Sequence, residues 1–168
     1  MDRIDRDLLV ALLDDGRATY QNLGQQVRLA PNTVADRVRR LQSSGVLTGF
    51  RAEIDVGALG LSTTLIVDVH LGEDVNRKDF EASLSAVPQV VSAVHLTGRY
   101  DYQLRVVCAD TAEFESVIEV LKHQHGVRQL ESHLVLREVP LGLAGLLNRP
   151  DISTRPAQES RGLPQRPK

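Results

Sequence analysis

The chain has 168 residues and a mass of 18.5 kDa, which suits one domain or two small ones. Apolar residues make up 42% and charged residues 25%, a balance that excludes a disordered or collagen-like chain. The one cysteine, Cys108, excludes an internal disulfide and a cysteine-based zinc cluster. The longest uncharged stretch, residues 82–98, contains Pro88 and predicts no membrane span, and the lack of an apolar segment after Met1 predicts a cytoplasmic protein.

The charge is distributed unevenly along the chain. Residues 16–51 carry six arginines against one acidic residue, Asp36, whereas residues 52–148 carry seven basic and fourteen acidic residues. A basic block on an otherwise acidic chain predicts that this block contacts a polyanion. A solvated surface of random charge is the alternative, and charge alone does not decide between the two.

Three short helices are predicted within the first 45 residues. The first two follow the N-cap candidates Asp2 and Thr19, and the third begins at Pro31 and ends at Gly45. The tight connection between the second and third helices has the spacing of a helix-turn-helix, although a plain three-helix bundle has the same lengths. The apolar faces are formed by Ile4, Leu8, Ala11 and Leu12, by Leu23 and Val27, and by Val34, Val38 and Leu41.

The arginines of the third helix favour DNA binding over a plain bundle. Arg37, Arg39 and Arg40 all lie off the apolar face of that helix. The third helix therefore combines an apolar face with a basic one, as a helix in a DNA major groove requires.

From residue 46 the apolar period changes and predicts strands. Residues 47–54 predict a short strand, and residues 57–60 predict a connector. The elements that follow are strand 65–71, helix 76–87, strand 90–96, turn 98–101, strand 102–108, a helix capped by Thr111 and ended by Gly126, and strand 127–139. This order predicts a ferredoxin-like βαββαβ domain, an antiparallel sheet with helices on one face. A second copy of the sheet is the simplest cover for the other face.

The predicted fold class is therefore α+β with four parts. Residues 1–50 form a winged-helix-like helix-turn-helix domain, and residues 51–62 form a linker strand and connector. Residues 63–140 form the ferredoxin-like domain, whose uncovered sheet face predicts oligomerisation. Residues 141–168 are an extension whose leucines predict a short apolar helix lying on a partner subunit, followed by a flexible proline-rich tail.

Short motifs along residues 2–140 carry a resemblance to a known family. The first motif is Asp2-Arg3-Ile4-Asp5-Arg6-Asp7-Leu8-Leu9, followed by Gly16-Arg17. The second lies on the third helix and just after it, and consists of Val34, Arg37, Val38, Leu41, Gly45-Val46-Leu47 and Gly49-Phe50. The third is Gly98-Arg99-Tyr100-Asp101-Tyr102, and the last is Gly126-Val127 with Ser132. In this order the chain resembles the Lrp/AsnC family of leucine-responsive, or feast/famine, transcriptional regulators. The resemblance implies a helix-turn-helix followed by the ligand-binding RAM domain.

Three positions in the turn of the helix-turn-helix depart from the family pattern. Gly24 replaces the usual alanine, Arg28 replaces a glycine, and Ala30 replaces the serine that would cap the third helix. The lost helix propensity at Gly24 and the lost cap at Ala30 each cost about 1 kcal/mol. These departures affect the seating of the third helix and hence the DNA sequence that it selects.

The predicted DNA contacts lie on the third helix and around it. The first residues of a recognition helix meet base edges, and flanking basic residues meet phosphates. The alternative for Arg37 is that its side chain folds back onto Asp36 or onto the first helix. The candidates are Asn32, Thr33, Asp36, Arg37 and Arg40 for base edges, with Thr19, Tyr20, Arg39 and Arg51 for phosphates.

The family binds small effectors, often amino acids, between sheet domains near the loop that corresponds to residues 98–101. A glycine permits close approach of backbone and ligand, and a carboxylate suits an ammonium group. An ordinary hairpin turn is the alternative, since it favours the same residues. The resemblance implies an effector site at Gly98, Tyr100 and Asp101, with walls from a neighbouring dimer at His133, Leu134 and Val135.

We therefore expect a sequence-specific transcriptional regulator that binds a double-stranded DNA operator, responds to an amino acid and assembles as dimers into an octamer. No catalytic or metal-binding residues are predicted, because the five histidines include no HExxH motif, and no cofactor is expected. Two alternatives remain. One is a nucleoid-organising protein with little sequence preference, and the other is an enzyme similar to the sirohaem decarboxylases, which share this architecture and act on a tetrapyrrole.

Overall fold

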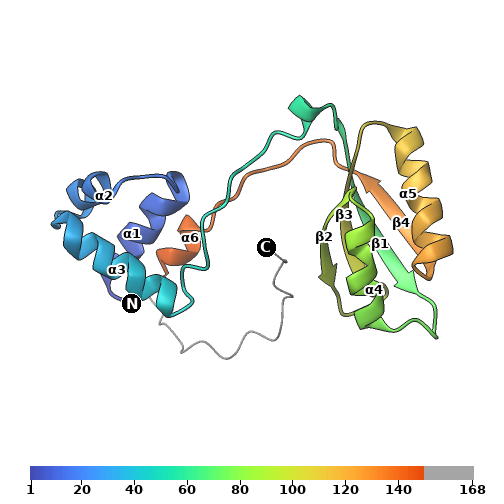
Figure 1. Cartoon of the computed structure of the whole chain (residues 1–168), viewed down its shortest axis with the longest axis horizontal. Helices are drawn as coiled ribbons and strands as arrows, with labels where there is room; N and C mark the ends of the chain where they lie inside the picture. The colour runs from blue at the N-terminus through green and yellow to red at the C-terminus, as the bar shows by residue number, and fades with distance from the viewer. Residues whose placement is uncertain (150–168) are drawn as a thin grey trace. The chain divides into compact units, whose positions relative to one another are not determined.

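The computed structural model describes residues 1–149, which form two compact units. The first unit contains residues 1–52 together with residues 140–149, and the second contains Glu53–Val139. In Figure 1 the first unit consists of helices, and the second is a sheet with two helices. The chain therefore passes between the two units twice.

The helices of the first unit are α1 (Arg3–Asp14), α2 (Tyr20–Val27), α3 (Pro31–Ser43) and α6 (Ala144–Leu147). Both predicted N-caps are confirmed, because the Asp2 carboxylate accepts from the Asp5 N–H and the Thr19 hydroxyl accepts from the Asn22 N–H. One apolar cluster joins α1, α2 and α3, and it confirms the predicted helix faces. Its buried members are Leu8, Leu12, Leu23, Val34 and Val38.

The turn between α2 and α3 depends on a glycine within α2. A Cβ atom at Gly24 would lie 2.5 Å from the Leu29 carbonyl oxygen, so any side chain there would require the backbone of the turn to shift. The cost in helix propensity expected at Gly24 is therefore offset by a close approach that alanine would block. Arg28 ends α2 with φ 57° and ψ 47°, in the left-handed region that favours glycine, and is strained there.

The predicted short helix of the extension is present as α6. It contacts α1 within the first unit of the same chain, whereas a partner subunit was expected to receive it. The predicted flexible tail after residue 149 lies outside the described residues.

The short strand predicted over residues 47–54 is wrong. These residues are described and form no strand, and the connector after them contains only the 3₁₀ turn η1 (Gly57–Leu59). A strand forms when a neighbour pairs with its N–H and C=O groups, and no part of the described chain pairs with this segment.

The second unit has the predicted ferredoxin-like topology. Its four antiparallel strands lie in the order β2-β3-β1-β4, and two helices connect them. The elements are β1 (Thr63–Leu71), α4 (Arg77–Ser83), η2 (Leu84–Ala86), β2 (Val90–His95), β3 (Tyr102–Cys108), α5 (Thr111–Gln124) and β4 (Val127–Leu134).

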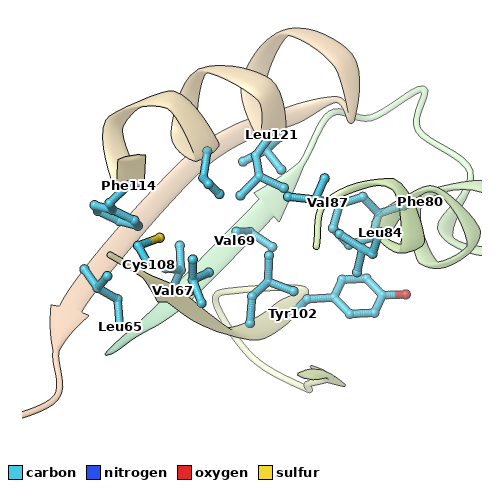
Figure 2. Packing of buried hydrophobic residues seen from close by; sticks show 14 of the residues in the cluster. Leu65, Val67, Val69, Phe80, Leu84, Val87, Tyr102, Cys108, Phe114 and Leu121 are labelled. Atoms are coloured by element: carbon cyan, nitrogen blue, oxygen red, sulfur yellow. The ribbon is translucent and has the colours of Figure 1, made fainter. Parts of the chain in front are cut away.

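Alternation along β1 separates the two faces of the sheet. Leu65, Val67 and Val69 are buried and point toward the helices, where Phe80 of α4 and Leu121 of α5 meet them (Figure 2). The intervening residues of β1 point to the opposite face, because successive side chains of a strand alternate. This second face carries Ile66, Asp68 and His70 from β1 and Gln103 and Arg105 from β3.

Several boundaries differ from the sequence-based expectation, and three of the differences have a clear cause. The last strand ends at Leu134 rather than at residue 139, because its final partners lie at the beginning of β1. The cap of α5 is Asp110, whose carboxylate accepts from the Glu113 N–H, and not Thr111. The helix expected over 76–87 tightens after Ser83 into η2. Among the described residues, no helix is long and apolar enough to cross a membrane.

Candidate functional site

α3 presents a row of polar side chains on the side opposite its buried seam. Val34, Val38 and Leu41 are at most 3% exposed and pack into the first unit. Since α3 turns once every 3.6 residues, its opposite side faces outward, while Ala35 next to the seam is also buried. The outward row contains four exposed residues of the predicted base-edge set: Asn32, Thr33, Asp36 and Arg40.

Arg37 is the exception among the predicted base-edge residues. Its Nη1 atom donates to Oδ2 of Asp2 at 2.6 Å and to Oδ1 of Asp5 at 2.7 Å. Of the alternatives for this side chain, folding back onto the first helix is the one observed. Arg40 also reaches Asp5, at 3.3 Å, but its side chain stays 63% exposed.

The predicted phosphate contacts are all exposed in the first unit. Thr19 caps α2, and Tyr20, the first residue of that helix, is 45% exposed. Arg39 pairs with Asp36 on its own helix at 2.9 Å. Arg51 is exposed in the segment that follows α3. A pair of exposed groups contributes little to stability, so the Arg39 guanidinium is available for another anion.

The loop between β2 and β3 is pinned to β1 through Asp101. Its Oδ2 atom accepts from the Leu71 N–H at 3.0 Å and lies 2.7 Å from Nδ1 of His70. These contacts, with the Leu71 hydrogen bond as the largest cause, hold the pKa of the Asp101 carboxyl below its usual value. The loop begins at Gly98, whose φ of 122° favours glycine.

The second oxygen of Asp101 is less engaged than the first. Oδ1 lies 3.5 Å from Nη2 of Arg77, at the outer limit of a hydrogen bond. A carboxylate offers about four acceptor positions, so Oδ1 retains capacity for a further donor such as an ammonium group.

Tyr100 and His133 are connected on the uncovered face of the sheet. The Tyr100 hydroxyl donates to Oε2 of Glu131 at 2.6 Å, which raises the pKa of the phenol and lowers that of Glu131. His133 lies on the same strand as Glu131, with its Nε2 atom 3.6 Å from Oδ2 of Asp68. Two of the predicted effector residues therefore share one polar cluster.

Leu134 and Val135 lie away from this loop within one chain. Leu134 pairs with Leu65, whereas the Asp101 N–H bonds to the carbonyl of Val69, four residues further along β1. Four residues of a strand span about 13 Å. Any contribution of Leu134 and Val135 to the same site therefore requires another chain.

Sequence reasoning missed the partners Asp5, His70, Arg77 and Glu131. The spacing of Asp2 and Asp5 is that of a capping box, which signals a helix start but not the arginine that Asp5 binds. The other three lie 24 or 31 residues from their partners, and no local pattern links them. Among the described residues, no three His, Cys, Asp or Glu side chains are grouped to hold a metal ion.

A separate groove of about 620 Å³ lies in the first unit between α1, the end of α2 and α6. It is lined by apolar side chains such as Val10 and Leu143 and by the carboxylates of Asp7 and Asp14. None of the predicted site residues lines this groove.

The two units together define a class of protein. A three-helix unit with an exposed polar row on its third helix has the geometry of a helix-turn-helix DNA-binding domain. The unit joined to it is a ferredoxin-like sheet with a pinned loop, a separate domain with its own candidate binding site.

Family models match both parts of the chain. The AsnC-type helix-turn-helix domain matches residues 1–42, and the Lrp/AsnC ligand binding domain matches residues 64–141. The chain belongs to the Lrp/AsnC family of transcriptional regulators.

Individual relatives agree with this membership. The HTH-type transcriptional regulator AldR of Mycolicibacterium smegmatis is 35% identical over 83% of each chain. The Bkd operon transcriptional regulator of Pseudomonas aeruginosa is 34% identical over 84% of this chain and 94% of its own. A transcriptional regulator from Neisseria meningitidis, solved as a complex with L-Met, has a TM-score of 0.80 at 30% identity and covers 87% of this chain and 99% of its own.

Proposed function

We propose that this protein regulates transcription by inserting α3 into the major groove of a specific operator. The observation that carries the proposal is the exposed polar row of α3, which contains Asn32, Thr33, Asp36 and Arg40. Arg39 and Arg51, with Thr19 and Tyr20, supply the flanking phosphate contacts. The protein acts in the cytoplasm, where its operator is located, and needs neither a cofactor nor a catalytic residue.

The proposed effector is an amino acid bound at the loop formed by residues 98–101. The free acceptor capacity on Oδ1 of Asp101 suits an ammonium group, and the complex of the related Neisseria regulator with L-Met supports an amino acid. Gly98 and Tyr100 line the same loop. Leu134 and Val135 contribute from a second dimer, because they lie far from the loop of their own chain. His133 lies beside Glu131, the partner of Tyr100, and so contributes from the same chain as the loop.

The proposed functional unit is a dimer, and four dimers form an octamer. Apolar side chains that a single chain leaves exposed support self-association. They follow β4 along the connector and include Leu136 at 89%, Val139 at 60% and Leu141 at 86% exposed. The two α3 helices of a dimer meet half-sites about one helical turn apart, so the operator is a near-palindrome. A light-scattering mass of 18.5 kDa, that of one chain, would contradict this assembly.

Selection from a pool of random duplexes tests the operator proposal. The wild-type protein is expected to enrich a near-palindromic sequence and to bind it at least about a thousandfold more tightly than random DNA at the same salt concentration. Equal affinities for the two would favour the nucleoid-organising alternative. A tetrapyrrole absorbance band in the purified protein would favour the decarboxylase alternative.

The effector proposal is tested with a panel of amino acids and the enriched duplex. One member of the panel is expected to change both the DNA affinity and the oligomer mass, because a ligand shifts an assembly equilibrium only by binding one state more tightly. The absence of any response across the panel would contradict an amino-acid effector.

A further inference from the structure

The carboxylates at the start of α1 face the recognition helix α3. Asp5 is the one charged residue among the buried side chains of the described chain, and its carboxylate is 4% exposed. It accepts from the Asp2 N–H at 3.0 Å, while the Asp2 carboxylate accepts from the Asp5 N–H at 2.8 Å. This reciprocal capping box fixes both carboxylates relative to the backbone of α1.

Arg37 bridges these two carboxylates from α3. Its Nη1 atom lies 2.6 Å from Asp2 and 2.7 Å from Asp5, and its side chain is only 21% exposed. Hydrogen bonds between charged groups at such distances are short and strong, and they are directional. Removing one partner would leave a buried charge on Asp5 without its main counter-charge, which is strongly unfavourable.

The other contacts that hold α3 are less specific. Ala30, at the N-cap, makes no side-chain hydrogen bond to the helix, and the seam of Val34, Val38 and Leu41 is apolar. Apolar contact is roughly proportional to buried area and has no preferred direction. The apolar seam determines which side of α3 faces outward, and the ion pair of Arg37 with Asp5 is the directional contact that fixes the rotation of α3 within that limit.

We infer that Arg37 is a positioning residue, which orients the outward row of α3 through Asp5 and Asp2 and does not itself touch DNA. The inference rests on the proposed insertion of α3 into the major groove. It separates Arg37 from Arg40, which shares Asp5 only at 3.3 Å and remains exposed. Arg40 is free to exchange Asp5 for a contact with DNA, whereas Arg37 keeps the helix in place.

The first test compares Arg37→Gln with Arg39→Gln in the full-length chain. Both changes remove one charge from α3, but Arg39 pairs with Asp36 on its own helix and is 70% exposed. Two duplexes are used, one of random sequence and one enriched by the wild-type protein from a random pool. The readouts are the thermal midpoint, the preference for the enriched duplex and the slope of log affinity against log salt on the random duplex.

Arg37→Gln is expected to lower the thermal midpoint by several degrees. It is also expected to reduce the preference for the enriched duplex over the random duplex about tenfold, which is the effect of one mismatched base pair. Its salt slope stays at the wild-type value, because no phosphate contact is lost. Arg39→Gln is expected to keep the midpoint and to make the slope shallower by about one.

The second test compares Asp5→Asn with Asp7→Asn. Both variants gain one unit of charge on α1, but Asp7 pairs with Arg3 of the same helix at 4.0 Å. Asp5→Asn is expected to reduce the preference for the enriched duplex as Arg37→Gln does, whereas Asp7→Asn is expected to keep the wild-type preference. Equal preferences in these two variants would overturn the inference.

Two results for Arg37→Gln would also overturn it. A shallower salt slope with an unchanged midpoint would make Arg37 a phosphate contact. A lower thermal midpoint with the wild-type preference for the enriched duplex would mean that the pair of Arg37 and Asp5 stabilises the fold without orienting α3 for DNA. If the wild-type protein enriches no sequence, the proposed function fails, and the salt slope of Arg37→Gln on random DNA still decides whether this side chain touches DNA.

Discussion

The two units of this protein assemble their candidate sites in different ways. In the first unit, the exposed row lies within residues 32–40 of one helix, and the buried seam of that helix determines which side faces outward. In the second unit, Asp101 meets His70 and Arg77 from other elements, and Tyr100 meets Glu131 of β4. The first site is local in sequence, whereas the second exists only when the sheet has formed.

This difference has a consequence for stability and for function. The outward side chains of α3 contribute little to folding, so they are free to follow the requirements of DNA recognition. Asp101 contributes to both the fold and the candidate site, because its carboxylate ties the loop to β1. Arg37 resembles Asp101 in this respect, since its contacts with Asp2 and Asp5 join α3 to α1. Substitutions in each unit measure how far the two units behave as separate structures.

The largest effect is expected from Phe80→Ala in the core of the second unit. Phe80 is 2% exposed and lies 5.0 Å, between ring centroids, from Tyr102. The cavity and the lost contacts are expected to cost about 3–5 kcal/mol. Calorimetry should show a lower transition for the second unit while the first unit keeps its own. Phe50→Ala, at a ring that is 51% exposed, is the control and is expected to cost less than about 1 kcal/mol.

Gly24→Ala tests the first unit by adding a methyl group, whereas Phe80→Ala removes a ring from the second unit. The added methyl group meets the Leu29 carbonyl oxygen at 2.5 Å, so the turn must open, at a cost of about 1–3 kcal/mol. The variant is expected to lower the transition of the first unit and to weaken DNA binding. Gly145→Ala adds the same group in open space and should leave both unchanged. Equal stability of the two variants would show that the turn is looser than described.

Asp101→Asn tests whether the loop depends on its carboxylate. The folded protein holds the pKa of Asp101 below its value in the unfolded chain, so ionised Asp101 stabilises the fold above about pH 4. This contribution is lost as the pH falls through the lowered pKa. Denaturant titrations at several pH values should therefore show a shallower acid limb for Asp101→Asn than for the wild type. Parallel acid limbs would mean that the contacts with Leu71 and His70 do not form in solution.

The smallest effect is an expected gain from Arg28→Gly. Arg28 occupies the left-handed region at the end of α2, and glycine adopts that conformation without strain. The free energy of unfolding is expected to rise by about 0.5–1 kcal/mol, as measured by urea titration. Arg39→Gly is the matched control, because a glycine inside the exposed face of α3 should instead cost about 1 kcal/mol. A loss of stability in Arg28→Gly would mean that the arginine side chain makes a stabilising contact.

Features that depend on local spacing could be predicted from the residues alone. The periodicity of Leu8, Leu23 and Val34 predicted the three helices and their buried sides, and the alternation along residues 65–71 predicted the inner face of the sheet. The order of the elements predicted the ferredoxin-like topology, because few topologies join such an order with short connections. The family resemblance, carried by short motifs in that order, was confirmed by both family models.

The tertiary structure decided what depends on partners far apart in the chain. It placed Arg37 on Asp5, 32 residues away, and so separated this side chain from the exposed row of α3. It joined Asp101 to His70, ended β4 at Leu134, close to the beginning of β1, and brought α6 onto α1. Hydrogen bonds and ion pairs form only when donor and acceptor lie about 3 Å apart. Only the folded chain brings these groups to that distance, and local spacing carries no record of it.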